Sequence, residues 1–305
     1  RRKIVVIESD DWGSIRMPSK QVYNYLLNNG VPVDKNYFNR FDSLESNDDL
    51  IALFEVLSAF KDKNENHPVI TANTLVANPD FERMNENGKS QYVYEPITET
   101  HKHYPNHDQV MKLWKQEDIQ NNLLYPQYHG REHLNAKKWL RVLNSGHQLE
   151  NIAFDQKALT GVSGGQQNRK NAYMAAFEYE NDDDKLTIEA MAKDGLDLFE
   201  KIFGFRSVTF APSQSIQGEH VNKVLAENGV KFHQLGQQFI PQPDGTLKMK
   251  NWFWGQRNKA GQTYWRRNAM FEPSRNQNFD WVDSCLEEIK IAFRWGKPAV
   301  INSHR

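Results

Sequence analysis

Cysteine is almost absent from this sequence: Cys285 is the only one in 305 residues. A single thiol excludes a disulfide within the chain and a metal site built from cysteines. Long apolar runs are also missing, because no stretch approaches the roughly 20 apolar residues that span a bilayer. Neither sign of charge is in excess, since 38 Lys and Arg stand against 39 Asp and Glu. The sequence therefore gives no electrostatic reason to expect binding to nucleic acid or to an anionic membrane surface.

The sequence also lacks an initiator methionine and a signal peptide, and it stops at residues 302–305 in the middle of a motif described below. We therefore expect both ends to be trimmed, so the missing targeting signals carry little information. The compartment stays open between the cytoplasm and export to the bacterial periplasm or cell surface. The sequence does not indicate an oligomeric state.

Apolar runs typical of strands alternate with amphipathic helical patterns along the chain. The strand-like runs cover residues 3–9, 69–75, 123–128, 207–211, 231–235, 263–271 and 298–302. The helical patterns cover residues 19–30, 50–60, 108–120, 130–146, 186–203, 219–228 and 280–296. About seven strand–helix units in strict alternation predict a parallel sheet with helices outside it. We therefore predict a single α/β domain over residues 1–305, folded as a distorted parallel (β/α) barrel.

Insertions are predicted between these units. Residues 78–107 are polar and rich in Pro and Asn, which predicts a long loop. The three histidines within residues 101–107 are then expected to be solvated or to line a substrate site. The aspartate triplet at 182–184 predicts a solvated turn. Residues 239–254 predict a β-hairpin around the Pro-Asp-Gly turn at 243–245.

Two adjacent carboxylates, Asp10 and Asp11, follow the first apolar run. That run is short, β-branched and unbroken, which predicts a strand buried on both faces. Neighbouring like charges repel, and the end of a buried strand is a costly place for them. The pair is explained if one carboxylate binds a cation and the other stays free to move a proton.

Two histidines, His129 and His133, follow the third predicted strand at i, i+4 spacing. If a helix begins at Gly130, both imidazoles project from one face. The carboxyl ends of parallel strands meet at one edge of a sheet, so we expect these rings near Asp11. Two ring nitrogens and a carboxylate form a metal-ligand set that leaves positions open for water and substrate. The alternative is a pair of surface or capping histidines.

The order of these motifs resembles that of the polysaccharide deacetylases, the carbohydrate esterases that include chitin-oligosaccharide and peptidoglycan deacetylases. The first motif of that family is Thr-Phe-Asp-Asp-Gly, and residues 8–13 are Glu-Ser-Asp-Asp-Trp-Gly. The second is His-Ser/Thr-x-x-His, and residues 129–133 are His-Gly-Arg-Glu-His. The last is Leu-x-His, and residues 301–304 are Ile-Asn-Ser-His, with one extra residue. The resemblance is an ordered set of short motifs spread over the whole chain.

The resemblance implies a role for each of these residues. Asp11, His129 and His133 would hold a divalent metal, usually zinc. Asp10 would be the general base that takes a proton from the attacking water, and His304 the general acid that protonates the leaving amine or alcohol. The implied activity is the removal of N- or O-linked acetyl groups from a polysaccharide or oligosaccharide.

Two motifs of the family are altered in this chain. The third, Arg-x-Pro-Tyr, corresponds to Phe-Ala-Pro-Ser at residues 210–213, which lacks the Arg that normally holds the base aspartate. Arg16, Arg266 and Arg267 are candidates to replace it, and their spacing does not choose between them. The fourth motif contains Asp-Trp and is replaced by Phe-Glu-Pro-Ser at residues 271–274. A later Asp-Trp pair at Asp280 is interpreted as a helix N-cap.

Substrate contacts are predicted for six residues: Trp12, Tyr128, Ser213, Arg266, Arg267 and Glu272. Trp12 and Tyr128 are next to the predicted ligands and are expected to form walls of the site. A backbone N–H near Ser213 is expected to stabilise the tetrahedral oxyanion.

Three alternative functions stay open at this stage. His129-x-x-Glu132-His133 also matches a zinc metallopeptidase motif, in which Glu132 would be the general base. A glycoside hydrolase on a related barrel would use Asp10 or Glu272 as its carboxylates. The altered motifs would also fit a carbohydrate-binding relative that has lost catalysis.

Overall fold

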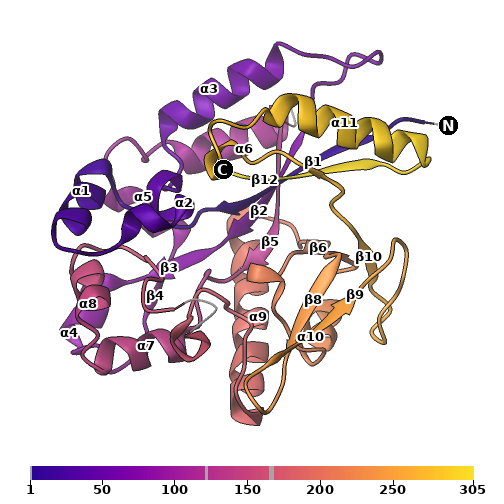
Figure 1. The fold of residues 1–305 in the computed structure, drawn as a ribbon. Coiled ribbons are helices and arrows are strands. Elements are labelled where there is room, and N and C mark those ends of the chain that lie inside the picture. Colours follow the sequence, from indigo (N-terminus) through magenta and orange to yellow (C-terminus); the bar gives the residue numbers. More distant parts are fainter. Residues whose placement is uncertain (1, 121–122, 165–167) are drawn as a thin grey trace.

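The computed structural model describes residues 2–120, 123–164 and 168–305. Its centre is a curled sheet of eight strands in which every paired neighbour is parallel, with helices around the outside (Figure 1). The strands lie in the order β10 (Thr263–Trp265), β7 (Phe232–Gln234), β6 (Thr209–Phe210), β5 (Leu124–Gly130), β2 (Ile70–Leu75), β1 (Val5–Trp12), β12 (Ala299–His304) and β11 (Ala269–Met270). The predicted distorted parallel (β/α) barrel is confirmed.

The barrel is open along one seam. Sheet order follows chain order from β1 to β10 in one direction, and β12 and β11 continue from β1 in the other. Closing the ring would place β10 beside β11, but the described residues form no ladder there. The sequence predicted one strand over 263–271, whereas the structure has two short strands separated by residues 266–268. The sheet therefore has eight strands instead of about seven.

The helices occupy the segments between strands. The α-helices are α1 (Lys20–Asn28), α2 (Tyr37–Phe41), α3 (Asn47–Ser58), α4 (Phe81–Glu86), α5 (Ile97–His103), α6 (Val110–Gln120), α7 (Ala136–Asn144), α8 (Gln148–Asp155), α9 (Asp182–Phe203), α10 (Val221–Glu227) and α11 (Trp281–Arg294), and the 3-10 turns are η1 (Val33–Lys35), η2 (Arg169–Asn171), η3 (Ser213–Ser215) and η4 (Pro273–Arg275). Asp280 caps α11 as predicted, because its carboxylate accepts a hydrogen bond of 2.9 Å from the Asp283 N–H. Within the described ranges, none of the helices has the length and apolar character needed to cross a bilayer.

Two small sheets lie beside the barrel. The predicted hairpin is confirmed as β8 (Gln237–Pro241) paired antiparallel with β9 (Leu247–Asn251). The other sheet pairs β3 (Ala77–Pro79) with β4 (Tyr94–Pro96), inside the region that the sequence predicted to be a long loop. The prediction of a long loop over residues 78–107 is therefore wrong, because this region contains β3, β4, α4 and α5.

Two further loop predictions are corrected by the structure. His101 is buried in α5, with its Nε2 3.5 Å from the Glu45 carboxylate, so it is neither solvated nor part of a substrate wall. The aspartate triplet at 182–184 forms the first turn of α9, where Asn181 caps the helix. Acidic residues are favourable there because they face the positive end of the helix dipole.

The strands alternate between an apolar outer face and a polar inner face. The outward side chains Tyr128 and Phe210 pack against α9 in a core that includes Phe199 and Leu196. The inward positions are polar and almost completely buried: Glu8, Asp10, Asn73, Gln127, His129 and Gln234. The first strand was predicted to be buried on both faces, and it is so from Glu8 to Trp12, with Glu8 and Asp10 belonging to this polar interior. Because side chains alternate between the two faces of a strand, every second residue of these strands places a polar side chain at the centre of the barrel.

Candidate functional site

The end of β1 departs from regular strand geometry. Asp11 has a positive φ of 68°, which is unusual for a residue other than glycine, and the pairing register with β2 shifts between Ser9 and Trp12. The Gly13 N–H that follows donates to both carboxylate oxygens of Glu45, at 3.2 Å each. This irregular turn allows Asp10 and Asp11, although adjacent, to line the same cavity.

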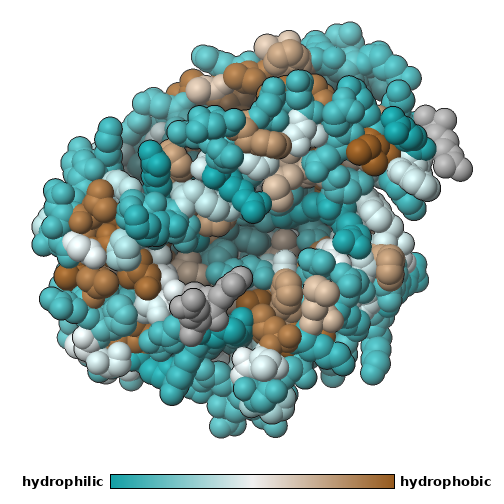
Figure 2. All heavy atoms as spheres, viewed as in Figure 1, coloured by the Kyte–Doolittle hydropathy of each residue, from teal (hydrophilic) through white to brown (hydrophobic). Residues whose placement is uncertain are grey.

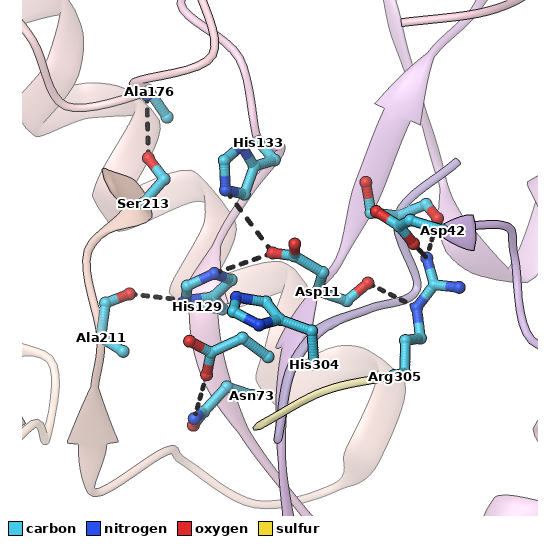
Figure 3. A network of polar contacts seen from close by, with 12 residues as sticks. Asp11, Asp42, Asn73, His129, His133, Ala176, Ala211, Ser213, His304 and Arg305 are labelled. Atoms are coloured by element: carbon cyan, nitrogen blue, oxygen red, sulfur yellow. Dashed lines mark hydrogen bonds and ion pairs between the residues drawn. The ribbon is translucent and has the colours of Figure 1, made fainter. Parts of the chain in front are cut away.

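Asp11, His129 and His133 converge into one cluster. The Asp11 Oδ1 lies 3.2 Å from the His129 Nε2 and 3.5 Å from the His133 Nε2, and all three residues are buried. Figure 3 shows both imidazoles pointing toward the Asp11 carboxylate. Within the described residues, this is the one group of three potential metal-binding side chains whose ligand atoms lie within 4.8 Å of one another.

The spacing and protonation of the cluster fit a divalent metal ion. Ligand atoms about 2.1 Å from a shared zinc ion lie about 3.0–3.4 Å from each other, close to the distances between Asp11 and the imidazoles. The His129 Nδ1 is 2.7 Å from the Ala211 carbonyl oxygen, which can only accept, so this nitrogen carries the proton. The Nε2 faces the Asp11 carboxylate, and in the neutral ring it would offer its lone pair to a cation held between the two groups.

The pKa values of His133 and His129 are shifted in opposite directions from the ordinary value for histidine. Burial lowers the pKa of His133 to about 4, so the ring is neutral and able to act as a ligand at neutral pH. Burial also acts to lower the pKa of His129, but the negative charges of Asp10 and Asp11 outweigh it and raise the value. A cation bound in the cluster would take the place of the proton that these carboxylates attract.

Asp10 is held apart from this cluster by Arg267. The guanidinium forms a bidentate pair with the Asp10 carboxylate, with Nη–Oδ distances of 2.6 and 2.7 Å, and the Asn73 amide donates to the same carboxylate at 2.7 Å. Burial acts to raise the pKa of Asp10, but Arg267 and His129 bring it well below its ordinary value. The carboxylate therefore stays ionised beside the cluster and is available to accept a proton.

Of the three arginines that the sequence offered as partners of Asp10, Arg267 is the one that pairs with it. Arg16 pairs instead with Asp42, at 3.1 Å, and Arg266 packs over Gly236, outside the lining of the cavity. The structure therefore does not place Arg266 where the predicted substrate contact would need it, in the lining of the cavity. The polar residues 266–268 break the predicted strand at this point, which turns Arg267 toward the interior.

Arg267 also contacts residues that sequence reasoning missed. Its Nε donates to Glu8 at 2.7 Å, and its Nη groups lie 2.9 Å from the Gln234 side-chain oxygen and 2.5 Å from that of Asn302. The Trp265 indole N–H donates to the other Glu8 oxygen at 2.8 Å. The missed signal was the spacing of polar residues two apart within strands, such as Glu8 and Asp10, which marks a polar inner face.

His304 is held by Glu272. The His304 Nδ1 contacts the Glu272 Oε2, and the Ser274 hydroxyl donates to the other carboxylate oxygen at 2.5 Å. Burial acts to lower the pKa of His304, but Glu272, Asp11 and Asp10 raise it to about 9. The imidazole is therefore protonated at neutral pH. Glu272 is buried and lies outside the cavity lining, so the structure places it against His304 instead of in the predicted contact with substrate.

Trp12 and Tyr128 were predicted to be walls of the site, and the structure places both in the hydrophobic core. Trp12 packs edge-on against Trp114, with ring centroids 5.9 Å apart, and Tyr128 packs between Phe199 and Phe210. Tyr128 points outward because strand neighbours alternate and His129 points inward. Trp12 points outward because the irregular backbone at Asp11 interrupts the alternation that would otherwise turn it inward with Glu8 and Asp10. Aromatic walls come from α2 instead, where Tyr37 and Phe38 line the cavity.

The Ser213 side chain is also buried outside the cavity. Its hydroxyl accepts a hydrogen bond of 2.9 Å from the Ala176 N–H (Figure 3). The next two residues, Gln214 and Ser215, have positive φ values of 54° and 58° and do line the cavity. The backbone at η3 therefore lines the cavity, while the Ser213 side chain does not, and the predicted oxyanion contact of a backbone N–H near Ser213 stays a prediction.

The peptidase arrangement is contradicted by the structure. His129 lies in β5 and His133 in the segment before α7, so the two residues are not on one helix, as the i, i+4 spacing suggested. Glu132 is buried, and its two carboxylate oxygens accept from Arg131 at 2.6 and 2.8 Å, outside the cavity. It cannot serve as a base next to the cluster.

The central cavity has a volume of about 680 Å³, which suits a ligand the size of a short oligosaccharide. Six predicted site residues line it: Asp10, Asp11, His129, His133, Arg267 and His304. Figure 2 shows the recess in the middle of this face, with hydrophilic residues at its floor. Three separate segments of the chain thus bring a candidate metal cluster, a carboxylate and an imidazolium into one space.

No protein-family model and no curated protein matches the chain. Among solved structures, the chain is similar to 4-alpha-glucanotransferase from Thermococcus litoralis, with 10% identity and a TM-score of 0.42 over 100% of this chain and 34% of that one. It is also similar to a Mycobacterium smegmatis protein named as a polysaccharide deacetylase (8% identity, TM-score 0.39, 98% of this chain and 76% of that one). A polysaccharide deacetylase from Bacillus cereus gives 11% identity and a TM-score of 0.34 over 87% of this chain and 65% of that one. The chain spans about a third of the length of the glucanotransferase.

Proposed function

We propose that this chain is a metal-dependent hydrolase that removes acetyl groups from a polysaccharide or oligosaccharide, the activity that its resemblance to polysaccharide deacetylases implies. One observation carries the proposal: Asp11 and two imidazoles lie at ligand spacing, with a separate carboxylate and a separate imidazolium lining the same cavity. These are the parts that hydrolysis of an amide or ester needs, namely an electrophile, a base and an acid.

Asp11, His129 and His133 would hold the metal, and the resemblance suggests zinc. A divalent cation bound there lowers the pKa of a water molecule and polarises the acetyl carbonyl. The Asp10 carboxylate accepts the proton of the attacking water, while Arg267 and Asn73 fix its orientation. A backbone N–H at η3, near Ser213, donates to the oxyanion that develops on the carbonyl.

His304 supplies the second proton transfer. Its imidazolium protonates the nitrogen or oxygen of the departing sugar, and Glu272 holds the ring in place through Nδ1. The Nε2 is then the atom that donates the proton. Phe38 packs edge-on against the same ring, with centroids 5.0 Å apart, and limits its rotation.

The proposal is tested by metal analysis of the purified protein, followed by acetate release from a panel of acetylated glycans. Asp10→Asn is expected to reduce turnover by roughly 10²–10⁴-fold, the usual contribution of a positioned base, and to leave the bound metal in place. Glu132→Gln is the control, and it is expected to retain turnover. Loss of turnover in Glu132→Gln alone would contradict the proposal and favour proteolysis.

Two other outcomes would assign the site differently. Release of reducing sugar without acetate would indicate a glycoside hydrolase, although the Glu272 carboxylate that such an enzyme would use is engaged by His304. Retention of metal with no release of acetate from any glycan would indicate a carbohydrate-binding relative.

The pairing of His304 with Glu272 predicts a specific pH dependence. The general acid must be protonated, and its pKa is raised to about 9, so activity should persist through neutral pH and fall as the pH rises through about 9. Glu272→Gln removes the charge that holds the proton, so this alkaline limb should move to lower pH, toward the ordinary value for histidine. A pH profile of kcat measures the shift, and an unchanged alkaline limb in Glu272→Gln would exclude His304 as the acid.

A further inference from the structure

Arg16 is a buried arginine that the chemistry above does not use. Its side chain is 7% exposed, and its Nε donates to the Asp42 carboxylate at 3.1 Å. The Phe38 ring lies 5.0 Å from the centre of the guanidinium and covers one of its faces. The guanidinium plane is therefore fixed from two sides, by an ion pair along one edge and by an aromatic ring.

The outer edge of this guanidinium is free within the described part of the chain. The two Nη groups make no hydrogen bond to any described residue, and Arg16 lines the cavity together with Asp11 and His133. The Asp42 carboxylate is shared between two arginines, because its other oxygen lies 3.2 Å from an Nη of Arg305. A nearly buried cation with unused donors is unfavourable unless a ligand supplies acceptors.

We propose that Arg16 binds a carboxylate of the substrate, so that the preferred glycan carries a uronic acid close to the acetylated position. The inference rests on the proposed deacetylase function and names its substrate class. With Nε already paired to Asp42, the two Nη groups form a planar fork that matches the two oxygens of a carboxylate. The fork opens into the same cavity as the cluster of Asp11, His129 and His133.

The test compares O-acetylated oligogalacturonate with O-acetylated xylo-oligosaccharide, which lacks the carboxylate. The wild type is expected to show the higher kcat/KM on the uronate. Arg16→Met should lower kcat/KM on the uronate by roughly 10- to 100-fold, the effect of losing one or two charge-assisted hydrogen bonds, and leave the value on the xylan substrate unchanged. Arg206→Met is the matched control, because Arg206 pairs with Asp197 and Glu200 at the surface.

Arg16→Lys guards against misfolding, because lysine keeps a positive charge beside Asp42 but lacks the planar fork. This variant should fold normally and lose most of the preference for the uronate. Equal kcat/KM values on both glycans in the wild type, with no effect of either substitution, would overturn the inference and leave the deacetylase function intact. A second outcome would also overturn the inference: the wild type shows no preference for the uronate, and acetate inhibits it but does not inhibit Arg16→Lys. The two Nη groups of Arg16 would then bind the acetate product.

A binding measurement separates this inference from the proposed function. Non-acetylated trigalacturonate is titrated into the wild type and Arg16→Lys by calorimetry. If the wild type binds trigalacturonate and Arg16→Lys binds it at least 10-fold more weakly, a carboxylate site is supported. This conclusion holds even if no acetate is released from any glycan. Equal binding to both proteins, or no binding to either, contradicts it.

Discussion

An Asp11→Asn variant is expected to lose tight binding of divalent metal and, with it, all measurable release of acetate. The carboxylate is the anionic member of the cluster, with its Oδ1 3.2 and 3.5 Å from the two imidazole nitrogens. Asparagine is the suitable replacement because it tolerates the positive φ of 68° at this position, which alanine does not. Since loss of an outer-shell partner alone weakens metal binding about 10- to 100-fold, loss of the charged ligand should exceed that range.

Metal content after dialysis and acetate release measure this outcome. His129→Ala should give the same result, whereas Asp10→Asn, one position away, should keep its metal and lose turnover only. A full equivalent of metal retained in both Asp11→Asn and His129→Ala would show that the cluster is not the metal site.

Arg267→Met is expected to destabilise the folded protein by about 3–5 kcal/mol, the effect of leaving buried charge uncompensated. Arg267 is the shared partner of two buried carboxylates, Glu8 and Asp10, which lie on the same face of β1. Unfolding in urea, followed by circular dichroism, measures the change in the free energy of unfolding. Turnover should fall as well, because Asp10 loses its bidentate partner.

The neighbouring residue provides a matched control for this prediction. Arg266→Met removes the same charge one position earlier, but Arg266 lies outside the cavity lining, so the loss should stay below about 1 kcal/mol. Adding Glu8→Gln to Arg267→Met should recover part of the stability, because one of the two unpaired charges is gone. Equal effects of the two arginine substitutions, or no recovery in the double variant, would contradict the shared-partner arrangement.

The alternation of strands and helices was readable from the sequence because it depends on local apolar periodicity. Asp10, Asp11, His129 and His304 could be placed at one edge for a related reason, since the ends of parallel strands meet there. The convergence of His129 and His133 was predicted correctly but for a wrong reason, because β5 continues to Gly130 and no helix carries both rings.

Other features could not be read from the sequence because they depend on the three-dimensional arrangement. Arg267 was indistinguishable from Arg266 until the break between β10 and β11 showed which side chain turns inward. The helices α4 and α5 have six and seven residues, too few for a clear amphipathic period in a polar region. Adjacency to a ligand in the chain does not place Tyr128 in the site, because a strand sends neighbours to opposite faces. Trp12 depends on the irregular backbone at Asp11, which no local sequence pattern reveals.

The short strand β11, at the open seam of the barrel, connects the two sides of the candidate site. Arg267 and Glu272 lie on either side of β11, a strand of two residues that is fastened to β12 and, through the Met270 N–H, to Glu288 of α11. A displacement of this one short strand would therefore disturb the proposed base Asp10 and the proposed acid His304 simultaneously. Substitutions that displace β11 are therefore expected to impair both proposed proton transfers and not one of them alone.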